Sequence, residues 1–277
     1  MSEIAVVRIL GNDLPPRHAP GQTLENLRFM LEHEPPLAGA VRLWVVNRIA
    51  DRQARDAVTA LLTAHGEIIH EIPFDAAAYR AAAAYRPGRT ELYRPPDTPA
   101  LREHHARVLY AINCNGARNV AIELGRETAS WVLPLDGNCI FSGEGWQALR
   151  GALEAASPDA CLVVPMYRLL ANDEYAAFST ADYPEAEPQL AFGPECEERF
   201  DEDWRYGYRS KMEVFMRLGM TLERSTYGSR VIDADRRAGH VLRLFSGVAE
   251  GEGEHGRRAE LRDQAIDQLL RRLEEIV

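Results

Sequence analysis

The stretch Trp131–Asn138, WVLPLDGN, decides which fold this sequence predicts. It begins as a continuous apolar run and ends abruptly in Asp136, Gly137 and Asn138. An apolar run of this kind, bounded by turn residues, is typical of a strand buried on both faces of a parallel sheet. A carboxylate, a glycine and an amide at its end indicate either an ordinary Asp-Gly turn or a place that holds a metal and a phosphate.

Strands and helices are expected to alternate in the chain before this stretch. The expected strands cover residues 4–10, 41–46 and 67–73, and the expected helices cover 23–34, 54–64 and 103–124. Thr23 is expected to cap the first of these helices. This rhythm predicts right-handed βαβ units and a parallel sheet, in which ligands bind beyond the carboxyl ends of the strands. Gly11 and Asp136 both follow such strand ends.

The second half of the chain is less regular. Strands are expected over 159–165, near Val231 and over 241–244, with helices over 210–219 and at the C-terminus. In residues 75–103 an alanine-rich helix is expected first, and the proline- and arginine-rich RPGRTELYRPPDTPA after it is interpreted as a long surface loop or lid, or as a disordered excursion. Residues 250–256 are interpreted as an acidic loop. Together these elements predict an α/β fold with a mostly parallel central sheet flanked by helices and an irregular second half.

The composition narrows the class of protein. A formal net charge of −10 argues against a general nucleic-acid binder, which needs a basic surface. The first residues carry no basic leader, and no apolar run is long enough to span a bilayer, so we expect a cytoplasmic protein without a transmembrane segment. The cysteines form no CxxC pair, so reduced thiols are expected at Cys114, Cys139, Cys161 and Cys196.

One face of the expected helix before the decisive stretch is polar. Asn115, Arg118 and Asn119 fall within an arc of about 100° on a helix that turns about 100° per residue. A guanidinium and two amides on one face suit a phosphate, or they tether a loop. The alternative is a surface arginine with two helix-weakening asparagines.

The ordered combination of these pieces resembles the core of GT-A glycosyltransferases, particularly those of the family 2 type. The resemblance lies in the segment NGARN at 115–119, the helix end at Gly125 and the strand WVLPLDGN. It implies a single GT-A, Rossmann-like domain over 1–277, with a nucleotide-sugar-binding half (1–141) and an acceptor-side half (142–277). It also implies transfer of a sugar from a nucleoside diphosphate sugar to an acceptor that the sequence does not identify, with inversion favoured.

The resemblance also implies roles for individual residues. Asp136 stands at the first acid of the family's metal motif and Asn138 at the second, where an amide should bind Mn²⁺ or Mg²⁺ more weakly than a carboxylate. His240 is a candidate for a late metal ligand, although a lone histidine before an apolar run is often structural. The donor nucleotide would contact Arg8, Gly11, Asn12, Asn115, Arg118, Asn119 and Asp136. Arg8 has the alternative of extending from its strand toward solvent.

The general base is expected in the acidic second half. Such a base takes the proton of the acceptor hydroxyl as that oxygen attacks the anomeric carbon. Asp201 and Asp203 precede an aromatic and basic segment, and Glu187 lies in what the sequence predicts to be a proline-marked loop. Acidic surface loops are also common in a protein of this charge, so all three remain candidates.

Two other functions remain open at this point. A nucleotidyltransferase would use a similar α/β scaffold, but such enzymes carry a glycine-rich basic loop after the first strand, and RILGNDLPPRH has one glycine and two prolines. A GT-A domain that has lost its activity and only binds a nucleotide sugar or a partner protein is the third hypothesis, and Asn138 motivates it.

Overall fold

The computed structural model describes residues 2–85, 98–208, 210–225, 228–246 and 255–277. Its centre is an eight-stranded sheet in the order β3-β2-β1-β4-β7-β6-β10-β5, and β8 and β9 form a separate hairpin. The strands are β1 (Ser2–Leu10), β2 (Ala40–Asn47), β3 (Ile68–Ile72), β4 (Ala129–Asp136), β5 (Cys139–Ile140), β6 (Cys161–Arg168), β7 (Glu185–Phe192), β8 (Leu222–Ser225), β9 (Gly228–Val231) and β10 (Val241–Arg243).

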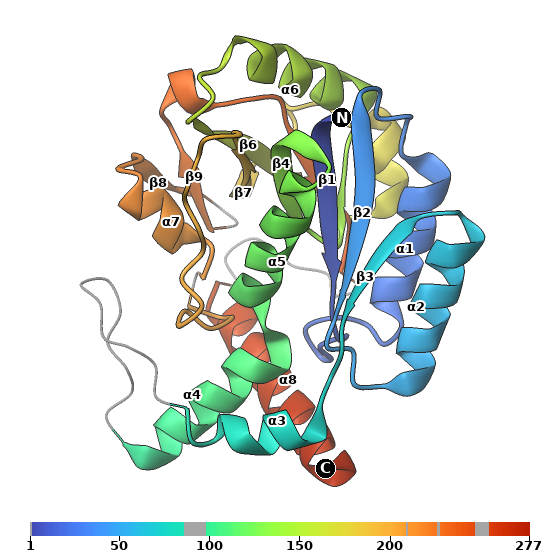
Figure 1. The fold of residues 1–277 in the computed structure, drawn as a ribbon, viewed down its shortest axis with the longest axis vertical. Coiled ribbons are helices and arrows are strands. Elements are labelled where there is room, and N and C mark those ends of the chain that lie inside the picture. Colours follow the sequence, from blue (N-terminus) through green and yellow to red (C-terminus); the bar gives the residue numbers. More distant parts are fainter. Residues whose placement is uncertain (1, 86–97, 209, 226–227, 247–254) are drawn as a thin grey trace.

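Helices cover both faces of this sheet and one of its ends (Figure 1). The α-helices are α1 (Gln22–His33), α2 (Arg52–Ala64), α3 (Ala76–Ala82), α4 (Pro99–Ile112), α5 (Cys114–Arg126), α6 (Gly143–Ala155), α7 (Met212–Arg217) and α8 (His255–Ile276). Short 3-10 helices cover Asn172–Ala177 and Ala234–Arg236. The α/β class expected from the sequence is confirmed.

The sheet is parallel in its first half and mixed in its second. β1 pairs in parallel with β2 and β4, and β2 pairs in parallel with β3. β7 then runs antiparallel between β4 and β6, while β6 and β10 are again parallel. As a result β1, β2, β4, β6 and β10 all end at the same edge of the sheet. The expectation of a mostly parallel sheet is therefore confirmed for the first half only.

Alternating side chains of the central strands enter two different cores. Ile4 and Val6 of β1 pack in a cluster with Trp146 and Leu149 of α6. Their neighbours Ala5 and Val7 pack on the other face with Ala121 of α5. This is why β1 and β4 read as continuous apolar runs: a strand with helices on both faces has no solvent-facing side. Helices α3, α4 and α8 gather beyond the carboxyl ends of β1 and β2 (Figure 1).

The helix predicted over 103–124 is two helices, and the prediction of one was wrong. α4 ends and α5 begins at Asn113, which has a left-handed φ of 48°. Asparagine tolerates this conformation better than most residues, and its amide nitrogen donates to Oδ1 of Asn47 at 2.9 Å. The break turns α5 away from α4, so that α5 runs along the sheet (Figure 1).

The N-terminus of α1 is capped from a distance. Thr23 lies inside the first turn and is not the N-cap, contrary to the prediction. Asp13 accepts hydrogen bonds from the backbone nitrogens of Gly21 (2.7 Å) and Thr23 (2.9 Å) and from the Thr23 hydroxyl. A carboxylate at this position satisfies helix N–H groups that have no partner within the helix, and it fixes the loop after β1 against α1.

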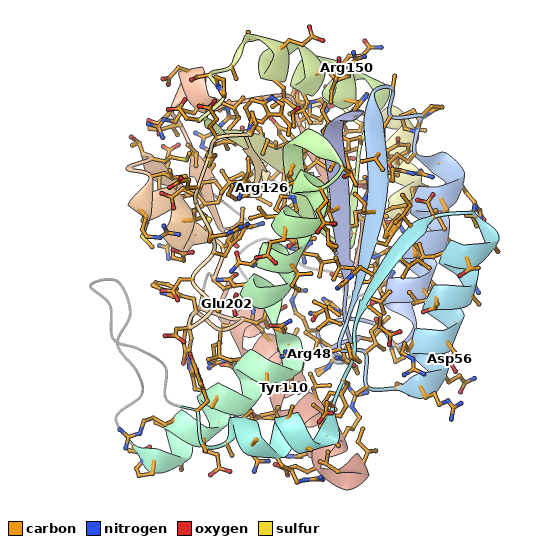
Figure 2. All side chains as sticks on the ribbon, in the orientation of Figure 1. Arg48, Asp56, Tyr110, Arg126, Arg150 and Glu202 are labelled. Carbon is orange, nitrogen blue, oxygen red and sulfur yellow. A yellow bond between two sulfur atoms is a disulfide. The ribbon has the colours of Figure 1, made fainter. Side chains whose placement is uncertain are left out.

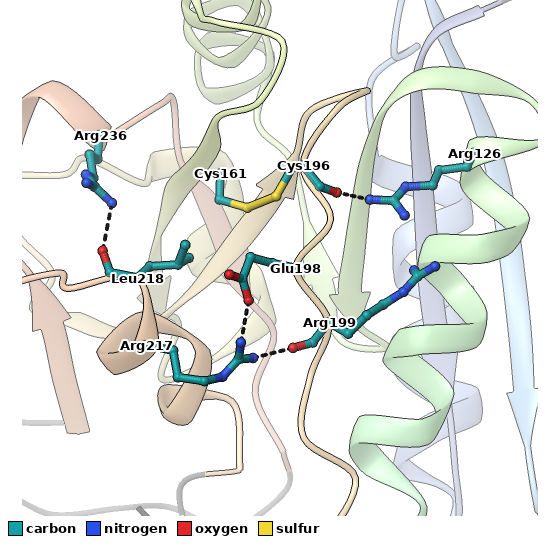
Figure 3. Close-up of a disulfide and its surroundings, with 8 residues drawn as sticks. All are labelled: Arg126, Cys161, Cys196, Glu198, Arg199, Arg217, Leu218 and Arg236. Carbon is teal, nitrogen blue, oxygen red and sulfur yellow. Dashed lines mark hydrogen bonds and ion pairs between the residues drawn. A yellow bond between two sulfur atoms is a disulfide. The ribbon is translucent and has the colours of Figure 1, made fainter. Parts of the chain in front are cut away.

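A disulfide joins Cys161 and Cys196, so the expectation of reduced thiols was wrong for these two residues. It ties the start of β6 to the segment that follows β7 (Figure 3). β6 and β7 are antiparallel neighbours, which brings their adjoining ends together although 35 residues separate the cysteines. Sequence spacing does not reveal that proximity. Cys114 and Cys139 are free thiols.

In the part of the chain that the structure describes, no helix has both the length and the apolar character needed to cross a bilayer. Most of the acidic segment 250–256 and residues 86–97 of the expected lid lie outside the described residues.

Gly137 is required by packing against β1. A Cβ atom at this position would overlap the carbonyl oxygen of Ile9 and lie 2.8 Å from Cδ2 of Leu10. Gly137→Ala should therefore lower the free energy of unfolding by about 1–3 kcal/mol, because the backbone beside Asp136 must move. Urea denaturation followed by circular dichroism measures the change. The control is Gly151→Ala in α6, where a Cβ meets nothing within 4 Å and alanine should stabilise the helix by about 0.5–1 kcal/mol.

Candidate functional site

A cavity of about 270 Å³ lies at the edge where the parallel strands end. One side is lined by Leu10 at the end of β1, Gly11 after it, Asp136 at the end of β4 and Arg168 at the end of β6. The segment before α7 and Arg262 of α8 line the other. Asn12 also lines the cavity, and its side chain is held by the backbone of Arg48 and Ala50 at 2.8 and 3.0 Å.

The charge of this cavity is opposite to that of the protein. Two carboxylates, Asp136 and Glu187, line it together with six cationic side chains, in a chain of net charge −10. The six are Arg17, Arg118, Arg168, Lys211, Arg243 and Arg262. Like charges gathered in a cleft with protein walls focus a positive potential, which attracts anions.

Asp136 lies at the centre of the cationic group. Its Oδ1 accepts from Nη2 of Arg118 at 2.9 Å, and its Oδ2 lies 3.3 Å from Nζ of Lys211. Nε2 of the buried Gln189 also donates to Oδ2, at 3.1 Å. Burial opposes ionisation of the carboxyl, but the charges of Lys211 and Arg118 outweigh it and hold the pKa of Asp136 well below its ordinary value. Asp136 is therefore an anion at neutral pH.

The pKa of His18, which also lines the cavity, reflects the positive potential there. Burial lowers its pKa, and repulsion by Arg17, Arg243 and Arg168 lowers it further, to about 3. A histidine whose charged form is disfavoured to this degree stays neutral at physiological pH. The positive charges of these three arginines thus all act on the part of the cavity that His18 lines.

The polar face of α5 tethers a loop and also reaches the cavity, so both interpretations from the sequence have support. Asn115 donates to the carbonyl oxygens of Asp201 and Ser210 at 2.6 and 2.8 Å. Asn119 exchanges two hydrogen bonds of 2.9 Å with the backbone of Phe200. Arg118 alone of the three lines the cavity, and it is held there by Oδ1 of Asn115 at 2.7 Å.

Arg8 belongs to the interior of the fold. Its side chain is completely buried, forms an ion pair with the equally buried Glu34, and donates to the carbonyl oxygen of Cys139 at 2.8 Å. Glu34 also accepts from the backbone nitrogen of Phe141 at 2.9 Å. This pair connects β1 to the end of α1 and to β5, and it does not extend to solvent.

Of the three candidate bases, Glu187 is the one that lines the cavity. It lies within β7 and not in a loop, contrary to the prediction. It is half-buried, and Gly228 leaves room for it, since a Cβ there would lie 2.7 Å from Cγ of Glu187. Asp201 accepts from the backbone nitrogen of Asp203 at 3.0 Å, and Asp203 accepts from the Tyr85 hydroxyl.

The oxygen donors expected to bind a metal do not form a set that fits a divalent cation. Both oxygens of Asp136 are taken by cations and an amide, and Asn138 lines the cavity with its amide nitrogen 3.5 Å from the carbonyl oxygen of Leu244. His240 lies 3.2 Å from the Ser142 hydroxyl and packs against Phe178. Over the described ranges, no three His, Cys, Asp or Glu side chains gather as metal ligands would.

A second cavity, of about 500 Å³, lies on the other side of the α4–α5 junction. It shares Cys114 and Tyr206 with the first, and its lining combines small apolar side chains of α3 and α4 with aromatic and polar ones. Among them are Tyr85, Tyr110, Trp204, Arg48 and Glu202. Arg48 lies over the ring of Tyr110 at 4.0 Å from its centroid, and Figure 2 shows the two residues beside the end of β3.

Sequence reasoning missed most of the cationic group. Arg168 and Arg243 each end a buried strand, and a polar residue at the end of an apolar strand is the same pattern that identified Asp136. Lys211 lies in a segment that the sequence analysis described only as basic and aromatic. Gln189 gave no signal, because an amide within an apolar strand has no characteristic pattern. Comparison with known proteins adds no assignment: no protein-family model matches the chain, and no curated protein matches it.

Proposed function

We propose that the protein is a glycosyltransferase of the GT-A type that binds the diphosphate of a nucleoside diphosphate sugar in the cationic cavity. The observation that carries the proposal is the gathering of six cations in the cavity that Asp136 lines, at the edge where the parallel strands of the sheet end. Ligands of open α/β sheets bind at this edge, and guanidinium groups suit phosphate oxygens. The likeness of NGARN and WVLPLDGN to the family supports the choice of a sugar nucleotide over other phosphates.

The cavity can support the transfer chemically. As the acceptor oxygen attacks the anomeric carbon, the bond from that carbon to the diphosphate breaks and negative charge develops on the leaving group. Arg118, Lys211 and Arg243 are already in place to stabilise that charge. Glu187, on the same cavity, takes the proton from the acceptor hydroxyl. The adjoining aromatic cavity is where the acceptor would enter.

A panel of ligands tests this function. UDP, GDP, ADP, CDP and dTDP and their sugar conjugates are added to the protein, and the melting temperature is measured. At least one should raise it by several degrees, because a ligand at 100 times its Kd adds about 2.7 kcal/mol of apparent stability. Release of free sugar from the best conjugate should then be detectable, with water as the acceptor.

Two arginines of α5 provide a matched comparison for this panel. Arg118→Met should abolish the thermal shift and the sugar release, whereas Arg126→Met should preserve both, since Arg126 donates to the carbonyl oxygen of Cys196 outside the cavity (Figure 3). No shift with any nucleotide would count decisively against the proposal. Binding without sugar release would favour the non-enzymatic alternative, and pyrophosphate release from a nucleoside triphosphate and a sugar phosphate would favour a nucleotidyltransferase.

A further inference from the structure

We infer that the cavity binds the diphosphate with its own side-chain cations, and that the ammonium of Lys211 takes the place of a divalent metal between Asp136 and the diphosphate. The inference rests on the proposed function and departs from the metal dependence that the sequence resemblance implies. It identifies Lys211 as a binding residue that sequence reasoning did not select.

The position of Lys211 is the first argument. Its Nζ lies 3.3 Å from Oδ2 of Asp136 and 3.3 Å from the carbonyl oxygen of Glu187, and only 6% of its side chain is exposed. An ammonium has three donors, and the described residues supply these two acceptors. The third N–H remains for a ligand in the cavity that Lys211 lines. Lys211 therefore offers what a metal ion would offer here: a positive charge that is bound to the aspartate and can still bind a phosphate oxygen.

The chemical identity of this residue is the second argument. Lys211 is the only lysine in the 277-residue sequence, and every other basic residue of the Lys+Arg total of 32 is arginine. Lysine carries a compact, nearly spherical point charge, whereas the guanidinium is a planar fork. The one lysine ammonium of the protein therefore lies beside Asp136, where a metal ion would otherwise bind, and the other cations that line the cavity are arginine guanidinium groups.

The balance of charge is the third argument. Six cationic and two anionic side chains line the cavity, so it carries four formal positive charges in excess, enough for a nucleoside diphosphate without a metal. Arg243 lines it with no side-chain hydrogen bond to another described residue. A divalent ion at Asp136 would have to displace Lys211 or Arg118 and would be repelled by both. The neutral His18 is a separate indication of the same positive field.

Calorimetric titration in the presence of EDTA tests the inference. UDP, GDP, ADP, CDP, dTDP and inorganic pyrophosphate are titrated into the protein in 1 mM EDTA and again with Mg²⁺ or Mn²⁺ in excess. For the nucleotide that binds best, Kd should change by less than about threefold between the two conditions. Lys211→Met should weaken its binding about 10- to 100-fold, the size expected for one charge-assisted hydrogen bond. Lys211→Arg should lose less, because the charge is kept.

A second readout does not depend on any variant folding. Protein grown with ¹³C-lysine has a single labelled side chain, so its Cε–Hε signal belongs to Lys211. That signal should shift when the nucleotide is added in EDTA. Binding that requires Mg²⁺ or Mn²⁺, or a signal that does not move when calorimetry detects binding, would overturn the inference and leave the proposed function intact. Absence of binding under both conditions would overturn both.

Discussion

Replacing Glu187 with glutamine should lower the rate of sugar release from the donor by about 100- to 10,000-fold, the usual contribution of a general base. Glutamine has nearly the same shape but cannot take a proton. The space against Gly228 should therefore remain filled, and Kd for the nucleotide should stay within about threefold of the wild type. Single-turnover measurement of released sugar, with Kd from calorimetry, separates the chemical step from binding.

The other two carboxylates are the controls for this result. Asp201→Asn and Asp203→Asn remove charges whose side chains accept a backbone N–H and a tyrosine hydroxyl. Both should release sugar within about threefold of the wild type. If Asp201→Asn or Asp203→Asn were the variant that lost activity while Glu187→Gln kept it, the base would be assigned to that residue.

Arg8→Met should be the most destabilising single substitution considered for this protein, lowering the free energy of unfolding by about 3–5 kcal/mol. The substitution leaves the buried carboxylate of Glu34, of whose side chain 1% is exposed, with only the more distant guanidinium of Arg42 at 3.9 Å, and it removes a hydrogen bond to Cys139. Urea denaturation at pH 7 measures the loss. The double variant Arg8→Met with Glu34→Leu should recover most of it, because neither charge is then buried.

The loss caused by Arg8→Met should depend on pH in a defined direction. Burial raises the pKa of Glu34 in the folded protein, against the opposing charges of Arg8 and Arg42, and removing Arg8 raises it further. An acid whose folded pKa is raised binds its proton more tightly when folded, so stability returns as the pH falls through that pKa toward the ordinary value near 4.5. A deficit that stayed constant from pH 7 to pH 4 would contradict the buried carboxylate of Glu34 as its cause.

The first half of the fold was predictable because its pattern is local. A strand with helices on both faces is apolar along most of its length, and β1, β2 and β4 show this directly in their residues. The irregular second half of the fold was less predictable from the sequence. The helix α6 was not predicted, and β7 was taken for a loop because its first half contains Pro188 and two glutamates, Glu185 and Glu187. Burial of β7 between β4 and β6 outweighs that composition.

The sequence by itself determined the βαβ order, the strand that ends in Asp136 and the polar face of the helix before it. Those features follow from periodicity and from turn residues, which act over a few positions of the chain. The tertiary structure alone decided that Lys211 and Arg243 join Arg118 at Asp136, that Arg8 pairs inward with Glu34, and that Cys161 reaches Cys196. The local sequence around each of these residues does not indicate which distant residue it will contact. The order of the strands in the sheet decides this, and that order forms only when the whole core packs.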